Sequence, residues 1–259
     1  MTYLPRVAAA TAAEWPDLAA ELDRWEEAGR TAPLWWRDDD AVVPTPQLDR
    51  LLALASDAPL ALAVIPQAAE PSLADRLADE RQVAVLQHGW SHANRAVIGK
   101  KSEYPAERDA AEVASELAEG RARLVALFGG RALPVLVPPW NRFAECFAPL
   151  LPELGIAALS QMAPRKAAPP AGLAVADVHL DLTAWREGRG FVGTGAALGR
   201  LIAELRARRA TGERTATGLL THHLVMDAAT EDFLARLGET VAAHPAARWL
   251  PASDLLPPR

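Results

Sequence analysis

Short apolar runs alternate with stretches of helical periodicity along most of the chain, and this alternation limits the possible folds more than any other feature. Seven runs predict strands at residues 34–37, 60–65, 82–86, 133–137, 156–159, 173–180 and 217–221, and 248–250 is a candidate short last strand. Several runs, 60–65 above all, are continuously apolar, as expected of strands covered on both faces. Seven strand–helix units predict a parallel sheet, and this number favours a closed barrel with outer helices over an open sheet.

Predicted helices separate these runs. Trp15, Leu18, Leu22 and Trp25 recur at helical spacing within residues 14–29, and Thr45-Pro46 has the residue types that begin a helix. Further helices are predicted at 72–79 with Ser72 as the cap, 105–128, about 143–153, 195–209 and 232–243. We expect one barrel domain over residues 1–259, with residues 1–32 as an N-terminal helical extension.

Composition excludes several classes of protein. The formal net charge is -6 and no basic stripe is present, so a nucleic-acid partner is not expected. The only cysteine, Cys146, which we place in the core of a helix, excludes an internal disulfide and a cysteine-based zinc site. No window approaches the roughly 18 apolar residues of a spanning helix, and no signal-peptide core follows the N-terminus. We therefore expect a cytoplasmic protein without a membrane partner; the oligomeric state is not indicated.

Polar residues follow five of the predicted strands directly. They are Asp38 to Asp40, His88, Pro138 to Asn141, Asp181 and His222. In a parallel barrel these strand ends meet around one mouth, where enzymes of this architecture keep their active sites. Folding alone does not explain polar residues at five separate strand ends.

His88 and His92 stand four residues apart, a spacing that on a helical turn puts both imidazoles on one face. A third ligand is needed, and the acidic triplet Asp38-Asp39-Asp40 offers a carboxylate at the end of another strand. Two histidines and one carboxylate, with positions left open for water and substrate, form a recurring catalytic metal site. The sequence therefore predicts a divalent metal at the mouth.

Taken together, these segments resemble the polysaccharide deacetylases of the NodB-homology type (carbohydrate esterase family 4), over about residues 34–225. The family motifs match Arg37-Asp38-Asp39-Asp40, His88-x-x-x-His92, Val137-Pro138-Pro139-Trp140-Asn141, Asp181 with Trp185, and Leu220-Thr221-His222. The resemblance implies a distorted (β/α)7 barrel, which agrees with the strand count. Two features depart from the family: the glycine after the aspartate pair is missing, and Val137 replaces the arginine that orients the catalytic base. Arg37 and Arg142 are the candidates to substitute for that arginine.

The resemblance also implies roles for the site residues. Asp40, His88 and His92 would hold the metal, with zinc expected and cobalt, nickel or manganese as alternatives. Asp39 would be the general base, although the pair Asp38 and Asp39 remains open as the register. His222 would be the general acid, with His223 as the alternative because strand side chains alternate.

The remaining candidates concern the substrate. Trp90 and Trp140 could form an apolar platform for a sugar ring, Pro139 stiffens the rim, and Asn141 could bind substrate or the base. Asp181 and Trp185 complete the substrate-binding set, Asp181 as a residue that orients a partner.

We expect a metal-dependent hydrolase that removes an acetyl or other acyl group from the amine of an N-acetylated sugar or a small saccharide precursor. A hydrolase of another linear amide in a small metabolite, and a carbohydrate-binding pseudoenzyme with a structural metal site, are the alternatives.

Overall fold

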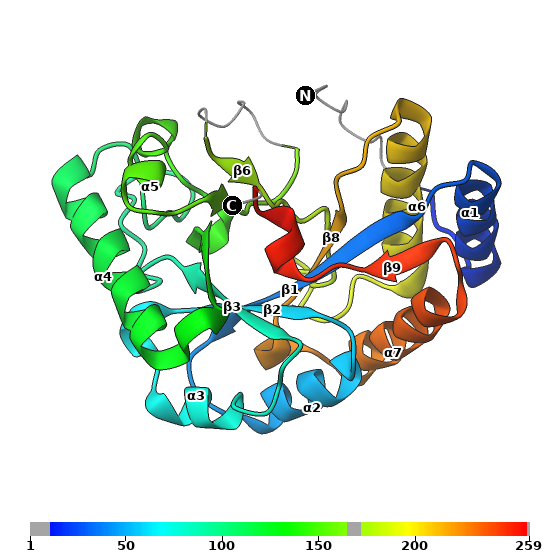
Figure 1. The fold of residues 1–259 in the computed structure, drawn as a ribbon, viewed down its shortest axis with the longest axis horizontal. Coiled ribbons are helices and arrows are strands. Elements are labelled where there is room, and N and C mark those ends of the chain that lie inside the picture. The colour runs from blue at the N-terminus through cyan, green and yellow to red at the C-terminus, as the bar shows by residue number, and fades with distance from the viewer. Residues whose placement is uncertain (1–10, 165–171, 258–259) are drawn as a thin grey trace.

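The computed structural model describes residues 11–164 and 172–257 and shows a parallel sheet curled into a distorted barrel with helices around it (Figure 1). Within these residues, eight strands pair in the order β6-β5-β4-β3-β2-β1-β8-β7, and β9 pairs with the start of β1. Their bounds are β1 (Ala32–Ala41), β2 (Leu60–Val64), β3 (Val83–His88), β4 (Ala132–Val137), β5 (Ala158–Leu159), β6 (Ala174–Val175), β7 (Leu180–Asp181), β8 (Thr217–Thr221) and β9 (Ala247–Trp249). The predicted (β/α) barrel is confirmed.

The α-helices of the described residues are α1 (Trp15–Glu27), α2 (Pro46–Ala55), α3 (Pro71–Arg76), α4 (Ala110–Phe128), α5 (Leu150–Glu153), α6 (Thr194–Thr211) and α7 (Ala228–Ala243). Thr45 caps α2 by accepting from the Leu48 amide, as its sequence predicts. The cap predicted for α3 is wrong, because Glu70 rather than Ser72 precedes that helix.

The helix predicted near 143–153 is largely absent. A 3-10 turn, Glu145–Phe147, and the single turn of α5 stand in its place. Pro149 and Pro152 explain the difference, because neither has an amide hydrogen to donate within a longer helix. Cys146 lies in the 3-10 turn and is exposed, so its predicted core position is wrong.

The predicted strand 173–180 appears as two short strands, β6 and β7, in one continuous passage. On one side, Ala174 and Val178 donate backbone hydrogen bonds to Ala157 and Gln161 near β5. On the other side, the His179 amide donates to the carbonyl of Gly218 in β8. The passage joins the two ends of the sheet, which explains why the barrel is distorted there.

Side chains of β1 alternate between two cores. Leu34 and Trp36 belong to the large apolar cluster between the sheet and the helices. Trp35 belongs to the smaller cluster inside the barrel, and Arg37 follows with the same parity. The alternation continues into the three aspartates that end the strand.

Helix α1 belongs to the predicted N-terminal extension and packs against α6. Glu21 on α1 is fully buried and accepts hydrogen bonds from Arg209 on α6, with 2.7 Å to Nε. Residues 1–10 of the extension lie outside the described residues, so the division at residue 32 stays a prediction. Among the helices that the structure describes, none has the length and apolar character needed to cross a bilayer.

Candidate active site

A β-bulge at the end of β1 sends the three aspartates in different directions. The pairing of β1 with β2 shifts register between Asp38 and Ala41, and Asp40 has a φ of 77°. A bulge of this kind redirects one side chain out of the strict alternation of a strand. As a result Asp39 and Asp40, although adjacent, both lie at the mouth, while Asp38 contacts the helix-facing side.

Asp40 meets His88 and His92 at the mouth. Its Oδ1 lies 3.1 Å from Nε2 of His88 and 3.3 Å from Nε2 of His92. One ligand atom from each of the three residues lies within 4.8 Å of the other two. The His88 side chain is almost fully buried, whereas those of Asp40 and His92 are 28% and 25% exposed. The donor set therefore fits a divalent ion that is open to solvent on one side.

The histidine spacing arises from a turn, not from the helical turn assumed for the sequence. His88 ends β3, and the chain then reverses through Gly89 and His92, whose φ angles are 59° and 56°. The Nδ1 of His88 lies 2.9 Å from the carbonyl oxygen of Val137, which it reaches as a hydrogen-bond donor. A backbone partner at one ring nitrogen orients the other toward a metal.

Electrostatics keep Asp40 ionised. Burial works to raise the pKa of Asp40, but the hydrogen bond with His88 and the charges of His88, His222 and His92 outweigh it and lower that pKa. Burial and the neighbouring His88 lower the pKa of His92. Burial opposes the charge on His88, yet Asp39 and Asp40 leave its pKa raised. An ionised carboxylate and a neutral imidazole are the forms that bind metal, and a cation would compete with the proton on His88.

A buried carboxylate holds the turn that carries His92. Glu103 is fully buried and accepts hydrogen bonds from the amides of Trp90 and Ser91, at 3.2 and 2.7 Å, and from the Ser91 hydroxyl at 2.8 Å. A Cβ added at Gly89 would lie 2.0 Å from Oε2 of Glu103 and 2.7 Å from Cδ of Pro139. Only glycine fits between these two residues.

Arg37 fixes the orientation of Asp39. Its Nε lies 2.8 Å from Oδ1 of Asp39, and its Nη2 donates to Oδ2 at 3.0 Å. The same guanidinium donates to Asn141 Oδ1 at 2.9 Å and to Ser160 Oγ at 2.6 Å. Arg142 instead donates to the carbonyl of Lys101. Of the two arginines considered as substitutes for the missing family arginine, Arg37 is the one that contacts Asp39.

Asp38 is committed to a buried contact outside the mouth. Its Oδ1 lies 2.5 Å from Nδ1 of His223, and its Oδ2 accepts from the Thr221 hydroxyl at 2.7 Å and the His223 amide at 2.9 Å. Burial disfavours the charged ring, but the Asp38 carboxylate raises the pKa of His223. Asp38 and His223 therefore form a structural pair that joins β1 to the turn after β8.

His222 lies at the mouth between Asp39 and Asp181. Its Nε2 lies 4.0 Å from Oδ2 of Asp39, and its Nδ1 lies 4.0 Å from Oδ1 of Asp181. Among the described residues, the buried Nδ1 has no hydrogen-bond partner. Trp185 packs edge-on against the ring at 4.6 Å and donates its Nε1 proton to Asp181 Oδ2 at 2.8 Å. Asp181 is thus held beside His222.

Of the predicted substrate-binding residues, Trp140 lies beside the triad, with its ring centroid 4.6 Å from that of His92. Trp90 is half-buried on the same loop as His92 and forms none of the aromatic ring pairs found in the part of the chain described. Pro139 is buried against Gly89, and Asn141 contacts Arg37 and thereby the base position. Whether these residues bind substrate stays a prediction.

Unusual backbone conformations gather at this mouth. Among residues 11–164 and 172–257, six residues other than glycine have positive φ angles, and four of them are Asp40, His92, Trp140 and Asn141. Such conformations cost free energy and persist where the surrounding structure enforces them, commonly at functional sites.

Sequence reasoning did not find Glu103 or Ser160. Glu103 lies at the end of a long loop, and nothing in the local pattern marks it as buried. Arg37, by contrast, stands two residues before Asp39 on a strand, so the shared parity places both side chains on one face.

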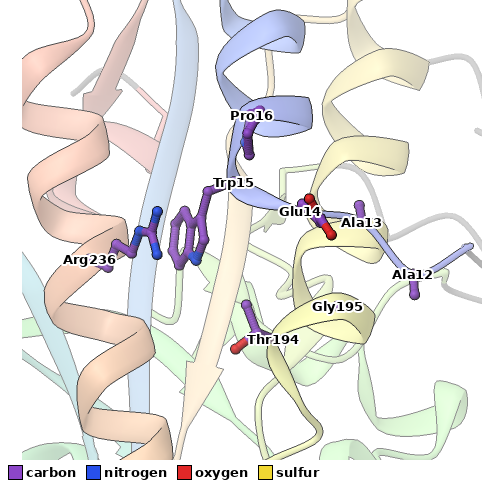
Figure 2. Close-up of a pocket in the computed structure, with 8 residues that line it drawn as sticks. All are labelled: Ala12, Ala13, Glu14, Trp15, Pro16, Thr194, Gly195 and Arg236. Atoms are coloured by element: carbon purple, nitrogen blue, oxygen red, sulfur yellow. The ribbon is translucent and has the colours of Figure 1, made fainter.

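A different hollow, with a volume of about 550 Å³, lies between α1, α6 and α7, and Figure 2 shows the residues that line it. Trp15, Thr194 and Arg236 line it, and the Arg236 guanidinium lies 4.7 Å from the Trp15 ring centroid (Figure 2). It lies in the outer helical layer, lacks every residue of the triad, and contributes nothing to the site at the mouth.

Known protein structures share this fold. No family model matches the sequence, and no curated protein matches it. A Mycobacterium smegmatis protein described as a polysaccharide deacetylase has a TM-score of 0.67 and 20% identity, with 98% of each chain covered. A family 4 carbohydrate esterase from Streptomyces lividans, solved with acetate, has a TM-score of 0.53 and 16% identity, covering 84% of this chain and 91% of that one.

A family 4 acetyl xylan esterase from Clostridium thermocellum, solved with a cobalt ion, has a TM-score of 0.54 and 14% identity, covering 86% of this chain and 89% of that one. At these identities the comparisons establish the fold. The resemblance inferred from the motifs is confirmed at that level, and the chain is a divergent representative of the fold shared by the polysaccharide deacetylases and family 4 carbohydrate esterases.

Proposed function

We propose that this protein is a metal-dependent hydrolase that removes an acetyl or other acyl group from the amine of an N-acetylated sugar. The convergence of Asp40, His88 and His92 at the barrel mouth carries this proposal. Two further observations support it: Arg37 holds Asp39, the candidate base, and His222 lies 4.0 Å from that carboxylate. Zinc is the proposed ion, with cobalt, nickel and manganese as alternatives.

Asp40, His88 and His92 would hold the metal, which supplies an acidified water and polarises the acyl carbonyl when bound. Asp39 would take the proton from the attacking water. Arg37 keeps that carboxylate oriented through two contacts and leaves it close to the ligand Asp40.

His222 would give a proton to the departing nitrogen. Its Nε2 lies 4.0 Å from Oδ2 of Asp39. Asp181 Oδ1 lies 4.0 Å from its Nδ1, and Trp185 restricts the position of both side chains. A general acid or base of this kind typically contributes about 10²–10⁴-fold.

The rim suits a sugar ring. Trp140 presents an aromatic side chain next to His92, and Trp185 is 45% exposed beside His222. Apolar ring faces flanked by a few polar groups are common in sites that bind small polar ligands. A small saccharide or N-acylated sugar is therefore the proposed substrate.

The test is acetate release from a panel of N-acetylglucosamine oligosaccharides by zinc- or cobalt-loaded protein, with and without chelator. Asp39→Asn should abolish turnover and retain one metal per chain, whereas Asp40→Ala should lose the metal. Asp38→Asn removes the same charge at the neighbouring residue and is the matched control. At equal folded fraction it should keep turnover, because Asp38 contacts His223 rather than the mouth.

Other outcomes distinguish the alternatives. If the acyl group is released from small amides but from no sugar, the proposed substrate class is wrong and the proposed amide hydrolysis stands. A bound metal without turnover on any amide would support a carbohydrate-binding pseudoenzyme. Loss of metal in Asp39→Asn with retention in Asp40→Ala would refute the assignment of the two carboxylates.

A further inference from the structure

The loop after β3, which carries His92, has an exposed apolar tip. Val97 and Ile98 are 95% and 90% exposed, more than the other large apolar side chains exposed in the described residues. Their neighbours Arg95, Lys100 and Lys101 are cationic, and residues 93–102 contain no acidic side chain. A protein with a formal net charge of -6 thus carries a local cluster of three positive charges around two solvent-facing aliphatic residues.

The same face of the barrel carries most of the other exposed apolar side chains. Five large hydrophobic residues are exposed within the described residues, and four of them follow the C-terminal ends of strands: Val97 and Ile98 after β3, Trp185 after β7 and Leu224 after β8. The fifth, Val125, lies on α4. Scattered single residues need no explanation, but a concentration around one mouth indicates an interaction surface.

The tip is held away from the barrel by a closed neck. Asn94 Oδ1 accepts from the amides of Ala96 and Ser102, and the Ser102 carbonyl accepts from the amides of Arg95 and Ala96. Arg142 donates to the Lys101 carbonyl at 2.7 Å. These bonds fix both ends of residues 97–100 and leave the tip itself in solvent.

We propose that this face docks on an anionic lipid bilayer, with Val97 and Ile98 entering the interface and Arg95, Lys100 and Lys101 facing the headgroups. In such a bilayer an apolar interior lies below a negatively charged surface. The two aliphatic side chains suit the interior, and the cations around them suit the anionic headgroups. A polyanion in solution would use the charges but leave the aliphatic tip unexplained. Docking directs the barrel mouth at the bilayer and departs from the expectation of no membrane partner, which considered only spanning and signal segments.

Vesicle flotation tests the proposal. Full-length protein is mixed at low salt with phosphatidylglycerol–phosphatidylcholine vesicles or with phosphatidylcholine vesicles alone. Wild type should float with the anionic vesicles and remain below with the neutral ones. The double variant Val97→Ser/Ile98→Ser should bind at least about tenfold more weakly, because the apolar component is lost. The double variant Arg95→Gln/Lys100→Gln should bind weakly as well, because the electrostatic component is lost.

Val125→Ser is the matched control, since it removes an exposed valine from α4, away from the mouth, and should bind as wild type does. Thermal unfolding confirms that each variant is folded. Asp39→Asn should also float as wild type does, which separates docking from the proposed hydrolysis. No flotation of wild type with anionic vesicles, or equal binding by the Val97→Ser/Ile98→Ser variant and Val125→Ser, would overturn the proposal.

Discussion

Replacing Arg37 with methionine is the most direct test of the arrangement around Asp39. The change keeps an unbranched side chain and removes the guanidinium that contacts Asp39, Asn141 and Ser160. Arg37 is fully buried and Asp39 is 2% exposed, so the little solvent that reaches the carboxylate does not replace the guanidinium. Breaking a buried ion pair by removing one member costs about 3–5 kcal/mol, because the other charge is left uncompensated.

Urea unfolding measures that cost. We expect Arg37→Met to lower the free energy of unfolding by about 3–5 kcal/mol, a large share of the ~5–15 kcal/mol typical of a domain. Arg142→Met is the control, since that arginine donates to the Lys101 carbonyl and contacts no carboxylate in the residues described. It should cost about 1 kcal/mol, the value of one ordinary hydrogen bond.

A double-mutant cycle with Asp39→Asn separates the ion pair from the volume change. If the pair acts as the distances indicate, the double variant is less destabilised than the two single costs added together, with a coupling of about 2 kcal/mol or more. Activity must not recover, because the carboxylate proposed as the base is absent. Equal costs for Arg37→Met and Arg142→Met, or a coupling below about 0.5 kcal/mol, would refute the reasoning.

Three further predictions concern stabilisation by zinc, the turn that Glu103 holds, and the loss of stability below about pH 6.5. Zinc at about one hundred times its dissociation constant should stabilise wild type by roughly 2.7 kcal/mol in thermal unfolding and leave Asp40→Ala unchanged; an equal shift in both would place the ion elsewhere. Glu103→Gln should weaken zinc binding about 10–100-fold in a chelator competition, because the new side-chain amide places a donor beside the backbone amides of Trp90 and Ser91. Glu107→Gln, at an exposed position, should leave the zinc affinity unchanged. Burial, with the charges of Arg208 and Arg200, holds the pKa of His179 well below its ordinary value. The unfolded chain binds that proton near pH 6.5 and the folded protein does not, so this contribution to stability is lost as pH falls below about 6.5, by up to about 1.4 kcal/mol per pH unit. His179→Asn should flatten the slope of stability against pH between 6.5 and 5; an unchanged slope would contradict the assignment.

Much of the barrel could be predicted from the sequence because apolar runs and helical periodicity report directly on burial. The predicted runs at 34–37, 60–65, 82–86, 133–137 and 217–221 all became strands. The predictions were weakest around 143–153 and 173–180. In the first segment prolines interrupt the helix, and in the second the strand pairs first with one edge and then with the other, which a hydrophobic pattern does not encode.

At the site, the sequence predicted which segments meet at the mouth but not how their side chains are positioned. Strand-end placement put Asp40, His88 and His92 at one mouth, as the structure does. The helical spacing assumed for the two histidines was wrong, because a turn with positive φ angles joins them. Long-range partners such as Glu103 could not be found, since burial of an acidic side chain depends on contacts between distant segments.

The bulge in β1 explains how three consecutive aspartates reach different surroundings. It also leads to a prediction that does not follow from the alternation of side chains along a strand. A φ of 77° at Asp40 costs an L-residue about 1–2 kcal/mol but suits glycine, which in turn loses about 0.4–1 kcal/mol through the flexibility of the unfolded chain. Asp40→Gly and Asp40→Ala both remove the carboxylate, so their difference isolates the backbone. Urea unfolding should show Asp40→Gly more stable than Asp40→Ala by about 1 kcal/mol. If alanine is as stable as glycine, residue 40 does not adopt the left-handed conformation, and strand parity would then turn its carboxylate away from His88.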